Sequence, residues 1–160
     1  MVDKYYDRIY PVVLRMVANE EIAKDLTQDV FLKAWENREK FRGDSDPGTW
    51  LYRIGVNVTL TWLDKQKRIQ STPLEENYLP DDKPGTQSKL EKHDDHTAVR
   101  NAVSSLNPKF RLVLIMHYYE DMKIDRIADI LKISRGTVAW RLFRARKLIE
   151  KHLLRSGIDY

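Results

Sequence analysis

Apolar residues in the N-terminal half of the chain recur every three or four positions, and charged residues occupy the opposite side. The first apolar stripe consists of Ile22, Leu26, Val30 and Ala34, widened by Phe31 and Trp35. The charged side carries Asp25, Asp29, Lys33 and Glu36. This spacing predicts an amphipathic helix that buries the apolar stripe and leaves the charges in solvent.

A second helix is predicted to begin at Asp46-Pro47, after a turn that contains Gly43. An aspartate accepts hydrogen bonds from the free N–H groups of a first helical turn, and proline fits the first helical position. The apolar residues of this helix fall on one face and are Leu51, Ile54, Val58 and Trp62.

The C-terminal third contains four predicted helices. The first, around residues 98–106, has Val99, Ala102, Val103 and Leu106 as its apolar residues. It ends before Asn107-Pro108, and residues 109–119 form the next helix. Residues 124–131 form a short helix whose inward residues are Ile124, Ile127, Ala128 and Leu131.

The last helix starts after Ser134, a natural N-cap, and continues towards Leu154. Its predicted buried residues are Val138, Leu142, Ala145 and Ile149. Only Lys132 and Ile133 separate it from the preceding short helix. Two helices joined by so short a turn are a helix-turn-helix signature.

Strand-like alternation is not sustained anywhere, so the predicted fold class is all-α. We expect two small helical domains, residues 1–68 and 93–160, joined by a flexible linker at 69–92. The linker carries prolines and repeated carboxylates, which disfavour a packed core. About 24 residues would reach roughly 80 Å when fully extended.

The net charge of +4 is distributed unevenly along the chain. Residues 1–70 carry +1, residues 71–97 carry −4 and residues 98–160 carry +7. This asymmetry indicates a polyanionic partner for the C-terminal third.

Several classes of protein are excluded by what the sequence lacks. It has no cysteine for a disulfide, a thiol nucleophile or an iron–sulfur cluster, and no glycine-rich phosphate loop. It also lacks a GxSxG or HExxH motif, an apolar signal segment and a stretch long enough to cross a bilayer. We therefore expect a cytoplasmic protein that is not an enzyme, has no cofactor and does not insert into a membrane. The tetrad His-Asp-Asp-His at 93–96 contains donors that suit zinc, but we expect it to be solvated.

The outward face of the last helix combines cations with two aromatic residues. Opposite its buried side lie Gly136, Trp140, Phe143, Arg144 and Lys147. Such a face suits the major groove, where cations meet phosphates or guanine edges and aromatics contact thymine methyl groups. The alternative is a solvated cationic helix with Trp140 packed on a neighbour.

Motifs in both domains resemble bacterial RNA polymerase sigma factors of the extracytoplasmic-function (ECF) group. The segments DLTQDVFLKAW (25–35), FRGDS (41–45) and TWLYRIGVN (49–57) are similar to sigma region 2. The segments LNP (106–108), IA (127–128), GTV (136–138) and RLFRAR (141–146) are similar to sigma region 4. The resemblance covers nearly everything except the linker. Lys132 occupies a turn position that often holds glycine in this group, so the turn must accommodate a side chain.

The resemblance implies three interaction surfaces. A core-polymerase face, which docks on the beta and beta-prime subunits, consists of Asp25, Gln28, Asp29 and Lys33. A minus-ten face, which opens and binds the minus-ten promoter element, consists of Trp50, Arg53 and Asn57, with Arg42 and Asp44 in the preceding loop. A recognition face, which binds the minus-thirty-five duplex, consists of Arg135, Gly136, Thr137, Trp140, Arg141, Phe143, Arg144 and Lys147.

The resemblance also implies an inhibitory partner, an anti-sigma factor. Two other functions stay open at this point. An ordinary transcriptional regulator would have an N-terminal effector domain and a C-terminal helix-turn-helix, but it would not need the minus-ten face. A structural adaptor that binds only protein would not need the positive C-terminal segment.

Overall fold

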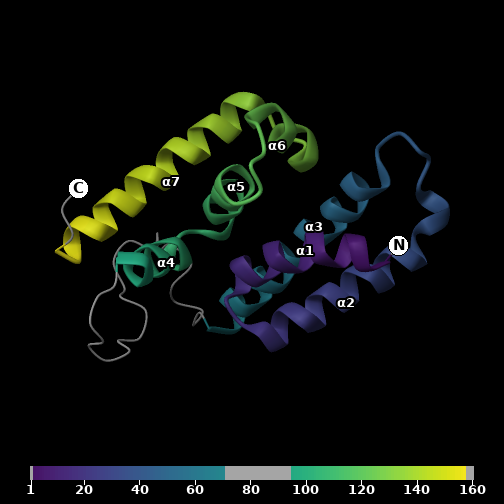
Figure 1. The fold of residues 1–160 in the computed structure, drawn as a ribbon, viewed down its shortest axis with the longest axis horizontal. Coiled ribbons are helices and arrows are strands. Elements are labelled where there is room, and N and C mark those ends of the chain that lie inside the picture. The colour runs from purple at the N-terminus through teal and green to yellow at the C-terminus, as the bar shows by residue number, and fades with distance from the viewer. Residues whose placement is uncertain (1, 71–94, 158–160) are drawn as a thin grey trace.

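The computed structural model describes residues 2–70 and 95–157. Its helices are α1 (Val2–Val17), α2 (Glu20–Glu36), α3 (Pro47–Gln70), α4 (Asp95–Ser105), α5 (Pro108–Tyr118), α6 (Ile124–Leu131) and α7 (Arg135–Arg155), with a 3-10 helix, η1 (Arg38–Lys40), after α2. No β-strand occurs among the described residues, and the all-α prediction is confirmed for them. Figure 1 shows α1, α2 and α3 as one group and α4 to α7 as another.

The first domain is a bundle of α1, α2 and α3. Ala18, with a φ of 54°, and the N-cap Asn19 make the tight turn into α2, and Asn19 accepts a hydrogen bond from Ile22 N–H at 3.0 Å. At Gly55, α3 approaches α1 so closely that a Cβ atom would lie 3.3 Å from Ile9 Cγ2. The core of this bundle contains Ile9, Val13, Ala23, Leu26, Val30, Leu51 and Val58.

Helix α3 begins as predicted and ends later than predicted. Asp46 Oδ2 accepts a hydrogen bond from Thr49 N–H at 3.2 Å, as expected of an N-cap. The helix runs on to Gln70 and so includes the first two residues of the predicted linker. Lysine, arginine and glutamine favour helix, and no proline occurs in this stretch after Pro47. Residues 71–92, and residues 93 and 94 of the polar tetrad, lie outside the described residues.

Two residues assigned to apolar stripes are exposed. Trp35 is 67% exposed, because nine residues after Leu26 the helix has turned to the side opposite its buried face. The Arg38 guanidinium lies over its ring, with Cζ 4.2 Å from the ring centroid. Val99 is 39% exposed, and the smaller Ala98 faces α7 instead. The stripes are therefore narrower than the apolar positions alone indicate.

The second domain is built along α7, the long helix at the C-terminal side in Figure 1. Helices α4, α5 and α6 all pack on it. Ser134 caps α7 as predicted, because its Oγ accepts a hydrogen bond from Thr137 N–H at 3.1 Å. Lys132 has a φ of 54°, a left-handed conformation that favours glycine. The turn thus accommodates the lysine side chain in a backbone conformation that favours glycine.

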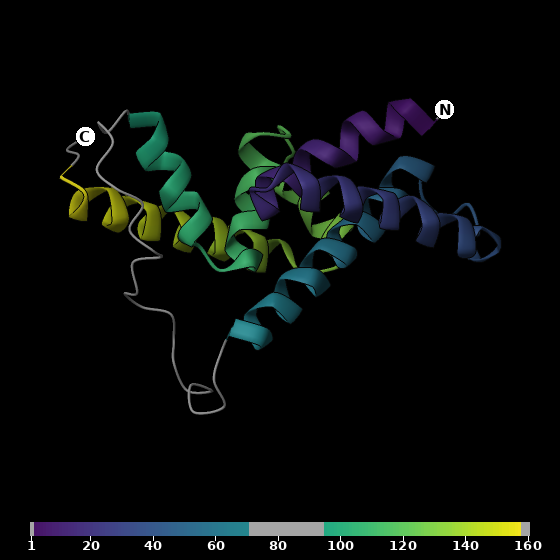
Figure 2. The same ribbon diagram turned by 90° about the horizontal axis from the view of Figure 1, so that it is seen from below.

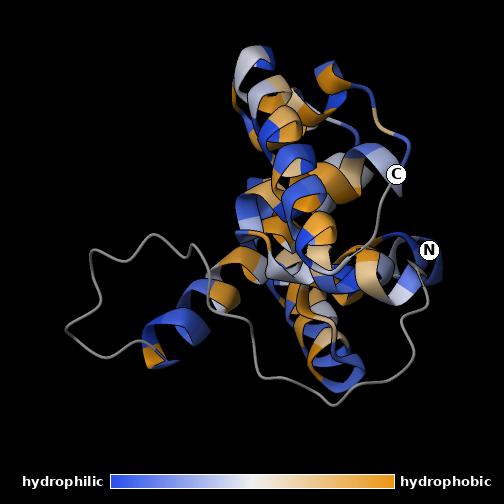
Figure 3. Cartoon of the chain, turned by 90° about the vertical axis from the view of Figure 1, so that its left-hand side faces the viewer, coloured by the Kyte–Doolittle hydropathy of each residue, from blue (hydrophilic) through white to orange (hydrophobic). Residues whose placement is uncertain are grey.

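The two domains share an apolar core. Helices α1 and α3 of the first domain contact α5 and α6 of the second. The shared cluster includes Val12, Met16, Tyr52 and Val56 from the first domain and Leu112, Met116, Ile127 and Ile130 from the second. Figure 2 gives a second view of the same arrangement, and Figure 3 shows hydrophobic residues, in orange, where the helices pack against one another. This contact was not predicted, because Tyr52 and Val56 lie on a second apolar side of α3.

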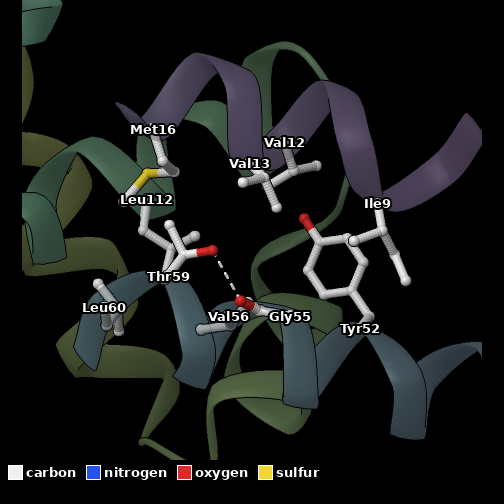
Figure 4. Close-up of a pocket in the computed structure, with 10 residues that line it drawn as sticks. All are labelled: Ile9, Val12, Val13, Met16, Tyr52, Gly55, Val56, Thr59, Leu60 and Leu112. Atoms are coloured by element: carbon white, nitrogen blue, oxygen red, sulfur yellow. Dashed lines mark hydrogen bonds between the residues drawn. The ribbon is translucent and has the colours of Figure 1, made fainter. Parts of the chain in front are cut away.

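A small apolar pocket lies within this shared core (Figure 4). The Tyr52 ring enters it from α3, and Leu112 closes it from the second domain. The Thr59 hydroxyl donates a hydrogen bond to the Gly55 carbonyl oxygen at 2.8 Å. The Tyr52 hydroxyl is buried without a hydrogen-bond partner, and burial raises the pKa of this phenol. Tyr52 is thus neutral in the folded chain at ordinary pH and contributes packing rather than charge.

Candidate nucleic-acid and polymerase interfaces

The predicted core-polymerase face lies on the solvent side of α2. Gln28, Asp29 and Lys33 follow Asp25 by three, four and eight positions, and all four residues are exposed. Leu32 and Trp35 lie on the same side, and they are 61% and 67% exposed. Exposed apolar side chains within a charged face are typical of a surface that binds protein. The sequence signal for Leu32 was its place on the helix between Asp29, three residues before it, and Glu36, four residues after it, but the predicted face did not include it.

The predicted minus-ten face projects from α3. Trp50, Arg53 and Asn57 are separated by three and four positions and share one side of the helix. Trp50 is half-buried, and its ring centroid lies 5.1 Å from that of Phe41 at a tilt of 43°. Asn57 is exposed. The Phe41–Trp50 contact fixes the base of the loop next to this face.

The loop before α3 presents polar groups to solvent. Arg42 and Asp44 are exposed on either side of Gly43, whose φ of 76° allows the chain to turn. Both residues are therefore accessible at the amino end of the minus-ten face.

Arg53 contacts the second domain. Its Nε donates a hydrogen bond to the Ile130 carbonyl oxygen at 3.1 Å, and its Nη2 donates to the Asp129 carbonyl oxygen at 2.8 Å. These oxygens belong to the last turn of α6, where helical carbonyls lack partners and the helix dipole attracts a cation. Arg53 therefore caps the first helix of the helix-turn-helix.

A groove of about 380 Å³ separates the minus-ten face from the helix-turn-helix. All three minus-ten residues of α3 line it, and so do residues of the turn and Arg141 of α7. Its cationic lining residues are Arg53, Lys109, Lys132 and Arg141, and its lining includes no carboxylate. The groove therefore favours anionic groups, with an apolar floor from both domains.

The predicted recognition face lies on the first four turns of α7. Six of its eight residues are exposed, and Thr137 and Arg141 are half-buried. Trp140 and Phe143 are 57% and 58% exposed, and the Trp140 ring packs edge-on against Phe110 at 5.7 Å. The two aromatic residues are available for contact, as the outward-face prediction requires.

Two polar contacts restrain the recognition face. Arg135 forms a salt bridge with Asp125 of α6, and both side chains are exposed. The Lys147 Nζ lies 3.4 Å from Glu150 Oε2 and 5.9 Å from the centroid of the Phe143 ring. Exposed pairs of this kind are worth little and can exchange with phosphate contacts.

The described residues offer no metal centre and no membrane span. No group of three or more His, Asp or Glu side chains in residues 2–70 and 95–157 could hold a metal ion. No helix in these ranges is long and apolar enough to cross a bilayer.

Comparison with known proteins assigns both domains. Residues 1–69 match the family model for sigma-70 region 2, and residues 96–149 match the model for sigma-70 region 4. RNA polymerase sigma factor YlaC of Bacillus subtilis is 30% identical over 157 residues, which cover 96% of this chain and 90% of YlaC. The ECF RNA polymerase sigma factor SigW of the same organism is 29% identical over 168 residues, covering 96% of this chain and 87% of SigW. The ECF sigma-E factor of Haemophilus influenzae is 30% identical over 165 residues, covering 96% and 85%.

Two solved structures share the fold. One is the sigma factor RpoE in complex with the anti-sigma factor NepR from Bartonella quintana, and the other is CnrH in complex with the cytosolic domain of CnrY. Each has a TM-score of 0.67 and 20% identity over 98% of this chain, and the matches cover 94% and 86% of the solved chains. With two sigma regions in order and relatives that match along nearly the whole length, the chain belongs to the sigma-70 family of RNA polymerase sigma factors, in the extracytoplasmic-function group.

Proposed function

We propose that this ECF sigma factor binds core RNA polymerase and directs it to promoters through two DNA contacts. The second domain binds the minus-thirty-five duplex through α7, and the first domain opens and binds the minus-ten element through α3. The observation that carries the proposal is that one chain presents both a helix-turn-helix with an exposed aromatic and cationic helix and a separate Trp50–Arg53–Asn57 face. A conventional regulator that binds only duplex DNA has no use for the second face.

The polymerase contact is proposed to centre on the core-polymerase face of α2. Asp25, Gln28, Asp29 and Lys33 supply charge complementarity, which sets orientation and association rate. Leu32 and Trp35 extend this face with apolar area, and Trp is enriched among the residues that dominate interface energies. The polymerase supplies the chemistry, so no catalytic role or cofactor is assigned to this chain. Its place of action is then the cytoplasm, where polymerase and chromosome are found.

The minus-ten contact is proposed to capture unpaired bases. Stacking of a base on an aromatic ring is worth about 1–3 kcal/mol, which is comparable to the few kcal/mol that unstacking costs. Trp50 offers such a ring at the edge of the groove, and the amide of Asn57 can hydrogen-bond an extruded base. Arg42, Asp44 and Arg53 complete the proposed site around them.

The minus-thirty-five contact is proposed to lie in the major groove. Arg144 has the geometry to bind a guanine edge, and Trp140 and Phe143 have apolar area for thymine methyl groups. Gly136 lets a phosphate approach the amino end of α7, where free N–H groups attract anions. Arg135, Thr137, Arg141 and Lys147 add phosphate or base contacts along the same helix.

An anti-sigma factor is the proposed inhibitory partner. Two proteins with this fold have been solved in complex with anti-sigma factors or a partner domain. The exposed apolar residues of α2 and α7 give such a partner surfaces to cover.

Run-off transcription with purified core RNA polymerase tests the proposal. We expect transcripts from specific promoters only when this chain is added, and we expect the chain to co-elute with core enzyme. As a matched pair, Arg144→Ala should reduce these transcripts, whereas Lys151→Ala, about one turn beyond the last residue of the recognition face, should not. Transcription that does not need the chain would favour the conventional regulator.

A further inference from the structure

The two exposed aromatic residues of the recognition face differ in what supports them. The Trp140 ring packs against the Phe110 ring of α5, with the centroids 5.7 Å apart and the ring planes at 61°. Phe143, three positions later, lies 5.9 Å from the Nζ of Lys147, an exposed side chain of the same helix. Trp140 is thus supported by an aromatic ring of a second helix, whereas Phe143 is next to the end of a flexible side chain.

Phe110 is itself held in place by the start of α5. Asn107 caps this helix, because its side chain accepts a hydrogen bond from Lys109 N–H and its carbonyl oxygen accepts one from Phe110 N–H, both at 3.0 Å. The half-buried Phe110 ring packs against an apolar cluster that contains Leu106, Leu114 and Ala145. A side chain packed on such a cluster has few alternative rotamers, so Phe110 is a fixed support for the ring that contacts it.

The contact with Phe110 leaves much of the Trp140 indole accessible. Trp140 is 57% exposed. A Cβ atom at Gly136, one turn earlier, would lie 3.9 Å from Ser134 Oγ, an ordinary van der Waals distance, so no atom crowds this surface. Helical side chains lean toward the amino end of their helix, and the indole therefore leans toward this open surface. Packing on a neighbour, the alternative role for Trp140, accounts for only part of its ring.

The orientation of the Trp140 ring decides which group of a base pair it can contact. A tryptophan on a helix surface has two common χ1 rotamers, and they send the indole to different places. Because edge-to-face aromatic pairs are favourable beyond the area that they bury, Phe110 stabilises one of these orientations. A side chain that is already ordered loses less conformational entropy when it binds, so a contact made in this orientation is strengthened.

We propose that Phe110 is a positioning residue for promoter specificity, which holds the Trp140 indole against the 5-methyl group of a thymine at one position of the minus-thirty-five duplex. In the major groove this methyl group distinguishes thymine from the other bases, and it suits the apolar surface of an indole. Phe110 acts only through Trp140 and makes no DNA contact of its own. This inference rests on the proposed function for the duplex that α7 binds.

Replacement of single thymines by deoxyuridine tests the proposal, because deoxyuridine lacks only the 5-methyl group. The probe is a fluorescent promoter duplex that the complex of the full chain with core polymerase selects from a random library. Competition binding then measures the affinity of each substituted duplex. We expect deoxyuridine at the position that Trp140 contacts to weaken binding by about fourfold, the value of one buried methyl group. Trp140→Ala identifies this position, because it removes the penalty there.

Two variants remove the support without altering the recognition face. Phe110→Leu keeps an apolar side chain on the cluster but lacks the ring, and Phe110→Met is a second replacement of the same kind. Each should bind the thymine duplex about fourfold more weakly and the deoxyuridine duplex unchanged, so that the penalty disappears. Val103→Ala is the matched control, because Val103 packs against the same cluster and its truncation removes neither ring. This control should keep the penalty at about fourfold.

The outcomes separate the positioning role from the proposed function. If the Phe110 variants weaken binding to the thymine and deoxyuridine duplexes equally, the penalty remains, and Phe110 is only a structural residue. If no thymine position shows a penalty that Trp140→Ala removes, the proposal is overturned even when run-off transcription succeeds. A complex that selects no minus-thirty-five sequence overturns the proposed function itself, and the positioning role falls with it.

Discussion

The two proposed DNA-binding faces differ in how the fold presents them. The recognition face on α7 points into solvent, with Trp140 and Phe143 more than half exposed. The minus-ten face on α3 borders a groove closed by the other domain, and Arg53 is bonded to that domain. The difference teaches that the face proposed for duplex binding is accessible in this structure, whereas the face proposed for strand opening is partly engaged by the other domain through Arg53.

The largest expected effect comes from the core that positions the recognition face. Leu142 lies on the buried side of α7 and is 1% exposed, so Leu142→Ala leaves a cavity. We expect the free energy of unfolding to fall by about 2–5 kcal/mol. Chemical denaturation monitored by circular dichroism measures it. An effect under about 1 kcal/mol would mean that α7 is not held by this packing.

Arg144→Ala tests the exposed face directly. Loss of one guanine contact should weaken binding to the minus-thirty-five duplex by about 1–3 kcal/mol, or roughly 5- to 150-fold in affinity. Fluorescence anisotropy with a labelled promoter duplex measures it, and affinity for core polymerase should not change. Equal weakening on all duplex sequences would instead assign Arg144 to a phosphate.

Asn57→Ala tests the minus-ten face. Removal of a hydrogen bond to an extruded base should reduce open-complex formation by about 0.5–1.5 kcal/mol, while duplex binding stays the same. Permanganate reactivity of the melted strand gives the measurement. Unchanged reactivity would remove Asn57 from the minus-ten site.

Tyr52→Phe has the smallest expected effect. It removes a buried hydroxyl that has no hydrogen-bond partner, so stability at pH 7 should stay within about 1 kcal/mol of the original or rise. The folded state raises the pKa of this phenol by burial, so its stabilising effect is fully present below the ordinary tyrosine pKa, about 10, and is lost as the pH rises beyond it. Thermal unfolding between pH 8 and pH 11 should show a shallower alkaline loss for the variant. Identical alkaline slopes would mean that Tyr52 ionises freely.

The helices from α2 onwards were predictable because local signals agree with the fold, whereas α1 was not among the predicted helices. Asp46-Pro47 and Ser134 mark helix starts through the hydrogen bonds that they supply, and both caps are present. The spacing of apolar residues alone was a less reliable guide to burial at the edges of the predicted apolar stripes. Trp35 lies four residues after Phe31, and it nevertheless has rotated out of the core.

The contact between the domains could not be predicted from periodicity. Helix α3 is apolar on two sides, and the sequence does not say which partner covers Tyr52 and Val56. Arg53 has the residue type and position of a DNA contact, so nothing in the pattern indicates that it caps α6. Such pairings depend on the relative placement of distant segments, which local propensity does not encode. The roles of the individual site residues stay predictions until the variants are made.

Arg111 has a mechanical consequence beyond holding the domains together. The same guanidinium that donates to Met16 also donates to the Ser104 and Leu106 carbonyl oxygens, at 3.0 and 2.9 Å, where α4 meets α5. Its burial lowers the pKa of this arginine, so it relies on these oxygens for stabilisation. If α1 moves away, Arg111 loses its hydrogen bond to the Met16 carbonyl oxygen. The same side chain also holds the corner between α4 and α5. Separation of the domains therefore weakens the corner where α4 ends and α5 begins.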